Sequence, residues 1–372
     1  MGFEQYPLRI LQISSASSFG GGERYLADLT NALYARGHDL FLAVRPHSPL
    51  VEQVQLAQTN IKTLPLRNAL DVQSAHELAR FVRKHEIEIV HAHMARDYSL
   101  VAYAARRNRA TKFVVTRHVL FPLNRLHRQT LARAHRVIAV SNAVAMELRN
   151  ERLTSDDRII VVHNGIDTDR FARVLTGFDR ADFLRRKGLS PDALLVGTIG
   201  ELRTLKRHDD FIRAAAIVAR QFPQTHFMLA GVDTSPSGEV RKQLEQLVTE
   251  LHLNDRFHFL GWLDNAEELL AALDVFVSAS ETESFGLAIA EAMAAGTAVV
   301  ATATEGATEV IEDQEAGLLV PIADPTRLAE AITTLLTNEG QRKQLGTRAQ
   351  HEVASRFSLQ RMVEAIEQIY TS

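Results

Sequence analysis

The segment from Glu283 to Glu291 combines two carboxylates with a glycine at the start of a predicted helix. It follows the apolar run Val275–Ser278, and Gly286 permits close approach of the backbone. The free N–H groups of a first helical turn suit a diphosphate, and a carboxylate on either side can accept hydrogen bonds from hydroxyl groups. A capped helix with solvent-facing glutamates is the alternative. The Ser-Phe-Gly insertion and the small residues from Ala288 to Gly296 favour a binding site.

Two cations follow another predicted strand, Leu194–Ile199, in the stretch Gly200-Glu-Leu-Arg-Thr-Leu-Lys-Arg. Arg203 and Lys206 are three residues apart, so both side chains can point to one strand end and neutralise a departing diphosphate. They could instead be ordinary cations at a helix start. That position is unfavourable for positive charge, because the helix dipole is positive there, so a binding role is the better interpretation.

A third signal is the glycine run Gly20–Gly22, between the first predicted strand and a helix from Glu23. Consecutive glycines let the chain fold tightly against a ligand and expose backbone N–H groups. The run lacks the spacing of a dinucleotide-binding loop. No acidic residue follows the second strand, which ends in Val44-Arg45-Pro46, where a ribose-binding carboxylate would stand.

These motifs need a scaffold that brings strand ends together, and the hydrophobic pattern predicts one. Short apolar runs alternate with amphipathic stretches such as Glu23–Arg36 and Asn124–Ala134, which is typical of parallel α/β sheets. The predicted strands are Leu8–Ser14, Leu40–Val44, Ile87–Ala92, Phe113–Thr116, Val137–Val140 and Ile159–Val162 in the first half, and Leu194–Ile199, His226–Ala230, Phe257–Leu260, Val275–Ser278, Ala298–Ala301 and Gly317–Val320 in the second.

The pattern predicts two doubly wound, Rossmann-like domains that face each other across a cleft. We place the first at residues 1–170, completed by a C-terminal helix within 357–372, and the second at 171–356. Ligands of open parallel sheets bind beyond the carboxyl ends of the strands. The three motifs all follow strands, so they lie at such ends.

Composition narrows the class of protein. The chain has 372 residues, 23% charged and 46% hydrophobic, in the range of soluble globular proteins. It has no cysteine, which excludes disulfides, thiolate metal sites and cysteine nucleophiles. Residues 1–7 do not resemble a signal peptide, and no apolar run is long enough to span a bilayer. We expect a cytoplasmic protein.

The net charge of −3 conceals an asymmetry. Residues 1–171 contain 23 Lys and Arg against 16 Asp and Glu. No acidic residue stands between Asp97 and Glu147, whereas nine basic ones do: Arg106, Arg107, Arg109, Lys112, Arg117, Arg125, Arg128, Arg133 and Arg136. One half of the molecule therefore presents positive charge.

Taken together, the motifs resemble those of the retaining GT-B glycosyltransferases of family 4, over essentially the full chain. The residues that carry the resemblance are the Gly20–Gly22 loop, Val90-His-Ala-His93, Thr116-Arg-His118, Ala139-Val-Ser-Asn142, Val162-His-Asn-Gly-Ile-Asp167, Gly200 with Arg203 and Lys206, Phe259-Leu-Gly-Trp262 and Glu283-x7-Glu291. One position departs: the commonest family pattern has arginine directly after the glycine, where this chain has Glu201. Arg203 matches a subgroup with Arg-x-x-Lys-Arg.

The resemblance implies a role for each motif residue. Arg203 and Lys206 would hold the donor diphosphate, Glu291 the ribose and Glu283 the hydroxyls of the transferred sugar. His118 would face that sugar. The remaining roles belong mainly to backbone groups: Gly21 and Gly22 at the phosphate or the acceptor, Ser284, Phe285, Gly286 and Leu287 at the sugar and phosphate, and Trp262 at the nucleobase.

Two patterns that suggest metal binding are better explained otherwise. His91 and His93 alternate at a strand end, which is usually structural, and the family needs no metal. Asp167-Thr-Asp169 imitates a metal motif of another glycosyltransferase fold, but follows Asn164-Gly165 at the domain junction. We expect no metal and no cofactor besides the nucleotide-sugar co-substrate.

The implied reaction is transfer of a hexose or N-acetylhexosamine from a nucleotide-sugar to an acceptor hydroxyl, with retention. No unassigned carboxylate is an obvious nucleophile, which favours same-face substitution. A nucleotide-sugar epimerase or a phosphorylase of the same architecture is an alternative, as is a catalytically silent nucleotide-sugar-binding partner protein. The complete set of charged residues argues against the silent protein.

The expected partners are a nucleotide-sugar donor, UDP-linked rather than GDP-mannose, and a glycan or lipid-linked acceptor of the cell envelope. The basic interval and the apolar Val119–Leu123 beside it suggest an anionic surface, which would place the enzyme peripherally on the inner face of the cytoplasmic membrane. A solvated arginine-rich helix face is the alternative. Nucleic acid is not expected, because no aromatic residues interleave with the basic ones.

Overall fold

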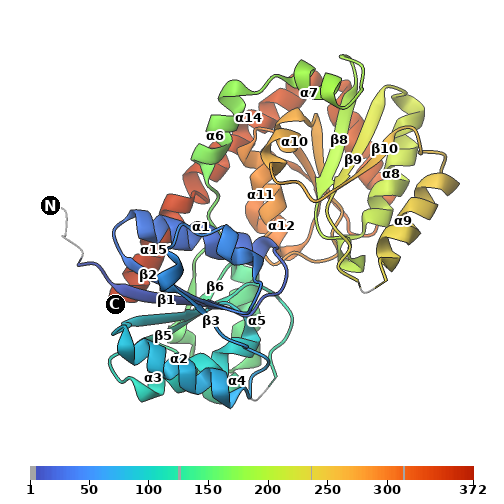
Figure 1. Cartoon of the computed structure of the whole chain (residues 1–372). Helices are drawn as coiled ribbons and strands as arrows, with labels where there is room; N and C mark the ends of the chain where they lie inside the picture. Colours follow the sequence, from blue (N-terminus) through green and yellow to red (C-terminus); the bar gives the residue numbers. More distant parts are fainter. Residues whose placement is uncertain (1–5, 125–126, 236, 313–314) are drawn as a thin grey trace. The chain divides into compact units, whose positions relative to one another are not determined.

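The computed structural model describes residues 6–124, 127–235, 237–312 and 315–372. The chain forms two compact units (Figure 1). Unit 1 comprises Met1–Gly165 and Leu359–Ser372, and unit 2 comprises Ile166–Ser358. Each unit is built on one parallel sheet, which confirms the predicted Rossmann-like fold class.

Unit 1 contains a seven-stranded sheet in the order β3-β2-β1-β4-β5-β6-β7. Its central strands are buried on both faces, as parallel strands covered by helices are, and they are mainly apolar, with the buried polar residues Gln12 and His91 among them. The strands are β1 Arg9–Ser14, β2 Asp39–Val44, β3 Ile61–Thr63, β4 Ile89–Ala92, β5 Lys112–Arg117, β6 Arg136–Ala139 and β7 Ile159–Val161.

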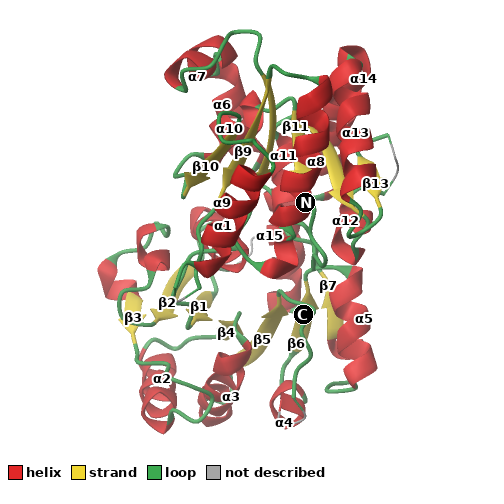
Figure 2. Cartoon of the chain, turned by 90° about the vertical axis from the view of Figure 1, so that its right-hand side faces the viewer, coloured by secondary structure: helices red, strands yellow, loops and turns green. Residues whose placement is uncertain are grey.

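Helices cover both faces of this sheet, with α1 and α15 on one side and α2 and α3 on the other (Figures 1 and 2). They are α1 Gly21–Ala35, α2 Val72–Lys84, α3 Tyr98–Arg107, α4 His127–Leu131, α5 Asn142–Glu151 and α15 Leu359–Thr371. Short 3₁₀ helices are η1 Pro49–Glu52, η2 Gln58–Asn60, η3 Ala95–Asp97 and η4 Asp156–Arg158.

The C-terminal helix α15 belongs to the core of unit 1. Its buried Met362, Val363 and Ile366 pack in the cluster that contains Ile10 of β1. A Cβ on Gly165 would lie 2.6 Å from the Leu359 backbone, so only glycine permits the approach of the two chain segments there.

Unit 2 contains a six-stranded sheet in the order β10-β9-β8-β11-β12-β13. The strand order reverses between β8 and β11, which makes that pair the switch point where ligands of such sheets bind. The strands are β8 Leu194–Ile199, β9 Thr225–Ala230, β10 Phe257–Gly261, β11 Val275–Ser278, β12 Ala298–Thr302 and β13 Leu318–Val320.

The helices of unit 2 also flank their sheet on both faces (Figure 2). Several begin at aspartate caps; Asp324, for example, accepts the Arg327 N–H at the start of α13, directly before a proline. The helices are α6 Thr168–Gly177, α7 Arg180–Arg186, α8 His208–Gln221, α9 Glu239–Glu250, α10 Ala266–Ala272, α11 Leu287–Ala294, α12 Glu305–Val310, α13 Pro325–Thr337 and α14 Glu339–Arg356, with the 3₁₀ helix η5 at Thr204–Lys206.

Two local expectations need correction. Strand β3, with only three residues, gave no readable pattern and was not predicted. The predicted helix Asn124–Ala134 is reduced in the described residues to the five-residue α4, because the chain around it closes in three-residue turns such as Arg133 N–H to Thr130 O.

Candidate functional site

The two charged motifs meet at the switch point of unit 2. Lys206 Nζ lies 2.6 Å from Glu283 Oε1, and the Ser280 hydroxyl donates to the same oxygen at 2.7 Å. A backbone hydrogen bond of 2.9 Å from Glu281 N to Leu205 O ties the two loops together. These loops follow neighbouring strands, so parallel topology alone places their cation and carboxylate at one edge.

Arg203 occupies the more open end of the same loop. Its guanidinium lies 3.4 Å from Glu201 Oε2, and its side chain is about half exposed. Glu201 is the residue that replaces the arginine of the common family pattern. An exposed pair of this kind contributes at most about 1 kcal/mol, so Arg203 can exchange Glu201 for an anionic ligand at little cost.

The start of α11 is the position at which the sequence predicts an anion site. Gly286 precedes the helix with φ +96°, a left-handed conformation that favours glycine. Phe285 is buried with its ring against Phe357, centroids 5.4 Å apart, so its backbone rather than its ring is available to a ligand. Ser284 and Leu287, on either side, are half-buried.

Glu291 has a partner that the sequence did not indicate. Arg170 of α6 reaches both Glu267 of α10, at 2.7 Å, and Glu291, at 3.7 Å. The cation therefore orients the Glu291 carboxylate from within unit 2. Asp167, part of the discounted metal motif, accepts the Arg170 N–H and begins α6 as its N-cap.

Trp262 follows β10, at the far side of the same sheet edge. Its ring is about half exposed, and its Nε1 donates to Asp264 at 3.1 Å. The exposed indole lies in the loop that the resemblance assigns to the nucleobase.

In unit 1 the glycine run and His118 come together. Gly21 begins α1 directly after the β1 loop, and a Cβ on Gly22 would lie 3.9 Å from His118 Cγ. His118 follows β5, and Tyr25 of α1 packs edge-on against its ring, with centroids 4.7 Å apart. The structure thus brings both predicted unit 1 features to one strand edge.

Two buried histidines pack behind His118: the ring of His93 contacts His118, and the ring of His91 contacts His93. His93 lies 3.3 Å from His118 Nε2 through its Nδ1 and 2.8 Å from Gln12 through its Nε2. His91 contacts Tyr370 and Thr116, both at 2.7 Å. Burial lowers the pKa of His91 and His118 to about 3, so both imidazoles are neutral near pH 7. His118 can therefore offer a hydrogen bond but not a charge.

Two family models match the chain in succession. "Glycosyltransferase Family 4" matches residues 19–170, and "Glycosyl transferases group 1" matches residues 179–352. The chain belongs to the family 4 glycosyltransferases.

Similar proteins agree with this family. The N-acetyl-alpha-D-glucosaminyl L-malate synthase of Bacillus anthracis is 29% identical, covering 96% of this chain and 95% of its own length. A lipopolysaccharide core biosynthesis glycosyltransferase, LpsE of Rhizobium meliloti, is also 29% identical, covering 95% and 96%. The structure of Anabaena HepE in complex with UDP and glucose has a TM-score of 0.85 at 22% identity, covering 98% and 99%. The protein is a glycosyltransferase with the GT-B fold.

Gly306 of this glycosyltransferase is a residue that sequence reasoning missed. Its N–H donates to Glu283 O at 3.0 Å. A Cβ there would lie 2.6 Å from both Glu283 O and Phe285 N, so α12 can back the motif loop only through a glycine. The sequence did contain a feature that could have identified it: Gly306 comes shortly after β12, the strand that follows β11 in both the sequence and the sheet.

His208 is a second missed residue of the glycosyltransferase. It is buried below the Arg203–Lys206 loop, with Nε2 3.1 Å from Glu201 O. Burial lowers its pKa to about 4, against the raising effect of the Glu201 carbonyl, so it supports the loop without adding charge.

Asp97 is the corresponding missed residue of unit 1. It is buried beyond β4, and one carboxylate oxygen accepts the Ser15 N–H at 2.8 Å. The other oxygen has no hydrogen-bond partner among the described residues. Burial raises the Asp97 pKa to about 6, although hydrogen bonds from Ser15 and the charges of Arg96 and Arg45 lower it.

Nearby, a hollow of about 460 Å³ opens at the carboxyl ends of β1, β2 and β3. Its lining is Ser17, Arg45, Pro46, His47, Pro65 and Arg67. It lies at the same strand edge as Gly22 and His118.

Among the described residues of the glycosyltransferase, no three His, Asp or Glu side chains gather as metal ligands. No helix in that part of the chain is long and apolar enough to cross a membrane.

Proposed function

We propose that this glycosyltransferase moves a hexose or N-acetylhexosamine from a nucleotide-sugar to an acceptor hydroxyl, with retention of configuration. The observation that supports it most strongly is the Lys206–Glu283 pair at the switch point of unit 2. A cation for the leaving diphosphate and a carboxylate for the sugar hydroxyls stand side by side there.

The proposed step is a same-face substitution. The bond between the anomeric carbon and the diphosphate oxygen breaks while the acceptor oxygen bonds to the same face, and the acceptor proton passes to the departing diphosphate. Lys206, Arg203 and the first-turn N–H groups of α11 stabilise the growing negative charge. Glu283 is held by Lys206 and Ser280, which suits an acceptor of hydroxyl hydrogen bonds better than a nucleophile.

The remaining positions complete the proposed donor site. Glu291, oriented by Arg170, accepts the ribose hydroxyls, and the backbone near Trp262 contacts the base. Ser284 to Leu287 contact sugar and phosphate. In unit 1, His118 and the glycines Gly21 and Gly22 share one strand edge, which we assign to contacts with the substrates.

A UDP-sugar is the favoured donor, with GDP-mannose as the competitor. The Arg-x-x-Lys-Arg spacing of Arg203 and Lys206 supports UDP, as does the likeness to a protein crystallised with UDP and glucose. Thermal stabilisation by a panel of UDP- and GDP-sugars tests the proposal. Stabilisation by a GDP-sugar alone would contradict it.

The proposed acceptor is a lipid-linked or cell-envelope glycan, bound over the hollow at β1, β2 and β3. The relative that builds lipopolysaccharide core supports this class. Arg45 and Arg67 in the lining also suit an acceptor with acidic groups. Malate, which the name of the Bacillus anthracis relative contains, is an acid of this kind. Product analysis with and without acceptor distinguishes transfer from epimerisation of the donor.

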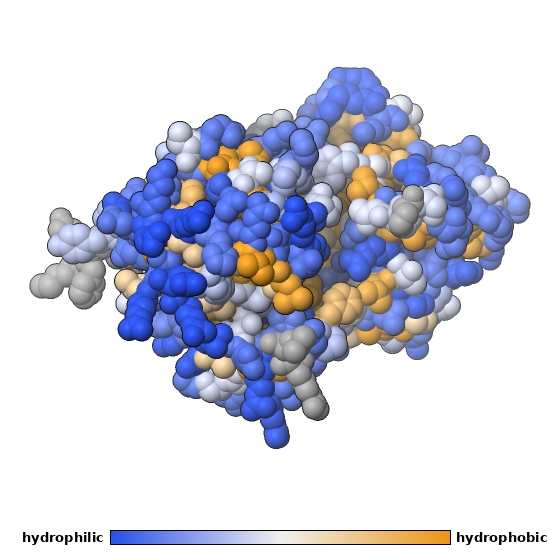
Figure 3. Space-filling model, turned by 60° about the horizontal axis from the view of Figure 1, so that its bottom comes forward, coloured by the Kyte–Doolittle hydropathy of each residue, from blue (hydrophilic) through white to orange (hydrophobic). Residues whose placement is uncertain are grey.

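We further propose a cytoplasmic enzyme that touches the inner face of the membrane through Val119 and Phe121, which are 39% and 51% exposed. Arg117 does not contribute to this surface, because it is buried and donates to Phe121 O. Arg125 lies outside the described residues. Most of the face in Figure 3 is hydrophilic, with apolar side chains in small patches, which suits shallow contact. Co-sedimentation with anionic vesicles tests this, with Phe121→Ser expected to reduce binding.

A further inference from the structure

The basic residues of unit 1 gather at the edge of the sheet opposite to the proposed active site. Lys112 begins β5 and Arg136 begins β6, whereas His118 follows the other end of β5. Arg106 lies in the last turn of α3, and Arg158 ends η4 before β7. A strand of six residues spans about 17 to 20 Å, so the two edges are separate places on unit 1.

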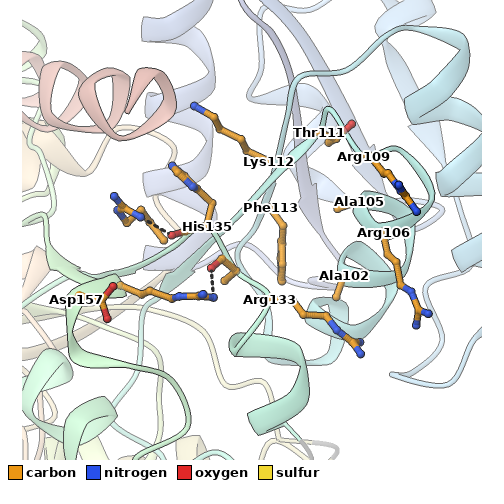
Figure 4. Close-up of a pocket in the computed structure, with 13 residues that line it drawn as sticks. Ala102, Ala105, Arg106, Arg109, Thr111, Lys112, Phe113, Arg133, His135 and Asp157 are labelled. Carbon is orange, nitrogen blue, oxygen red and sulfur yellow. Dashed lines mark hydrogen bonds between the residues drawn. The ribbon is translucent and has the colours of Figure 1, made fainter.

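These residues line a cavity of about 750 Å³, the basic pocket. Six of its lining side chains are Arg or Lys: Arg106, Arg109, Lys112, Arg133, Arg136 and Arg158. Asp157 is the single carboxylate in the lining. Figure 4 shows Lys112 and His135 on one side of Phe113, and Arg106, Arg109 and Arg133 on the other.

One group of these cations is held in place by backbone oxygens. Lys112 Nζ donates to the oxygens of Tyr370 and Ser372 at 2.9 and 2.6 Å. Arg136 donates to His135 O at 2.9 Å, and Arg158 to Ala134 O at 3.0 Å. These contacts fix the positions of the three charges, and Asp157 is the lining carboxylate whose charge interacts with Arg158 and Arg136.

The other group is exposed and unneutralised. Arg106, Arg109 and Arg133 form no ion pair with a carboxylate in the described ranges of the chain. Cations in the last turn of a helix complement its dipole, which accounts for Arg106. That reason does not apply to Lys112 and Arg136 at strand starts. The positive field also reaches His135, whose pKa is lowered first by burial and then by Arg136 and Lys112.

We propose that the basic pocket binds a ligand that carries two or more phosphate groups. Guanidinium groups bind phosphate in a bidentate manner, and three fixed cations facing three free ones can hold successive phosphates. The volume exceeds what one phosphate ion needs and is typical of pockets for whole small molecules. Phe113, the only phenyl ring in the lining, is buried and offers no face for base stacking, which favours phosphate groups over nucleic acid as the ligand.

Titration of the full-length protein with inorganic tripolyphosphate tests the proposal. The Lys206→Ala variant serves as the background, so that the proposed diphosphate site of unit 2 is weakened and the two proposals can fail separately. In this background, binding should weaken about tenfold or more when Arg106 and Arg133 are both changed to alanine. The pKa of His135, followed by NMR, should rise when tripolyphosphate binds, because the ligand neutralises the nearby cations.

The matched control is Arg107→Ala with Arg149→Ala. Both are exposed arginines of unit 1 outside the pocket lining, so the net charge changes equally. This control should retain binding and the His135 shift. Equal loss in both double variants would mean unspecific attraction to positive surface charge and would overturn the proposal, as would the absence of binding in the parent.

Two sources can supply such phosphates, a soluble phosphorylated molecule or a lipid headgroup. Vesicles that contain cardiolipin, which carries two phosphates, compared with vesicles of phosphatidylcholine alone, distinguish them. If the ligand is a lipid, the Arg106 and Arg133 double variant should lose co-sedimentation while the control keeps it. If the pocket serves a soluble ligand, tripolyphosphate binding should depend on the pocket and vesicle binding should not.

Discussion

The loop after β1 in unit 1 and the loop after β8 in unit 2 each follow the first strand of their sheet, but they carry different chemical groups. After β8, the cations Arg203 and Lys206 are each paired with a carboxylate, Glu201 and Glu283. After β1, Gly21 and Gly22 offer backbone, and the nearest functional side chain is His118, neutral by burial. The loop after β8 thus presents preorganised charge, whereas the loop after β1 presents uncharged backbone beside a neutral imidazole. The contrast suits a donor with a diphosphate and an acceptor hydroxyl.

The largest effect should come from removing charge in unit 2. Lys206→Ala should reduce kcat by about 10²–10³, because the lysine acts on charge that peaks in the transition state. His118→Asn in unit 1 should reduce it less, by about tenfold, because a neutral imidazole contributes a hydrogen bond only. Steady-state kinetics measure both, with the exposed Lys343→Ala as control. Unchanged kcat in Lys206→Ala would remove that residue from the mechanism.

The second largest effect on kcat should come from disturbing the close packing of Gly306 against the Glu283–Phe285 backbone. The methyl group of Gly306→Ala would collide with the Glu283–Phe285 backbone, at a cost of about 1–3 kcal/mol in stability. Displacement of Glu283 should lower kcat by about 10 to 100-fold. Gly340→Ala is the control, since its nearest neighbour is a side-chain oxygen at 3.5 Å. Thermal melting and kinetics together test this, and wild-type activity in Gly306→Ala would show that the loop tolerates movement.

Acid should affect unit 1 more than unit 2. His91, His93 and His118 bind protons in the unfolded chain below pH 6.5 but stay neutral in the folded state until far lower pH. Their contribution to stability is complete above pH 6.5 and is lost as pH falls, for His91 and His118 down to about 3. Within that pH range, each of these histidines lowers the free energy of unfolding by about 1.4 kcal/mol for every unit by which the pH falls. In unit 2, burial likewise lowers the pKa of His208, to about 4, and those of the less buried His226 and His258.

Asp97 acts in the opposite direction, because its raised pKa favours the folded state at low pH and disfavours it as pH rises through about 6. It offsets part of the histidine effect. Urea unfolding at pH 7 and pH 5, with hydrogen exchange to locate the change, should show unit 1 weakened by about 2 kcal/mol or more relative to unit 2. Equal loss in both units would contradict the neutral-histidine assignment.

The smallest expected effect is a difference in ligand affinity between variants of Glu291 and Glu283, the two motif carboxylates of unit 2. Glu291→Ala should weaken free nucleoside diphosphate by about 1–2 kcal/mol through lost ribose hydrogen bonds, and Glu283→Ala should weaken the intact donor only. Calorimetry with UDP and with UDP-sugar measures the difference. Equal loss of UDP affinity in both variants would refute the division of roles.

The main motifs and the fold class could be predicted from the sequence because their signals are local. Alternating apolar runs mark strands and helices, and residues that follow neighbouring parallel strands share an edge. Lys206 and Glu283, which are 77 positions apart, could be assigned to one strand edge on that basis. The departure at Glu201 was visible as well, but not its pairing with Arg203.

The supporting contacts were decided only by the tertiary structure, because each joins elements with no shared local pattern. Tyr370 reaches His91 from the last helix, and Arg170 reaches Glu291 from α6. Gly306 is required by a backbone approach that no spacing reveals. The basic interval was evident in the sequence, but β5 separates its apolar loop from the cations of the basic pocket, because a strand places its two ends at opposite edges of a sheet.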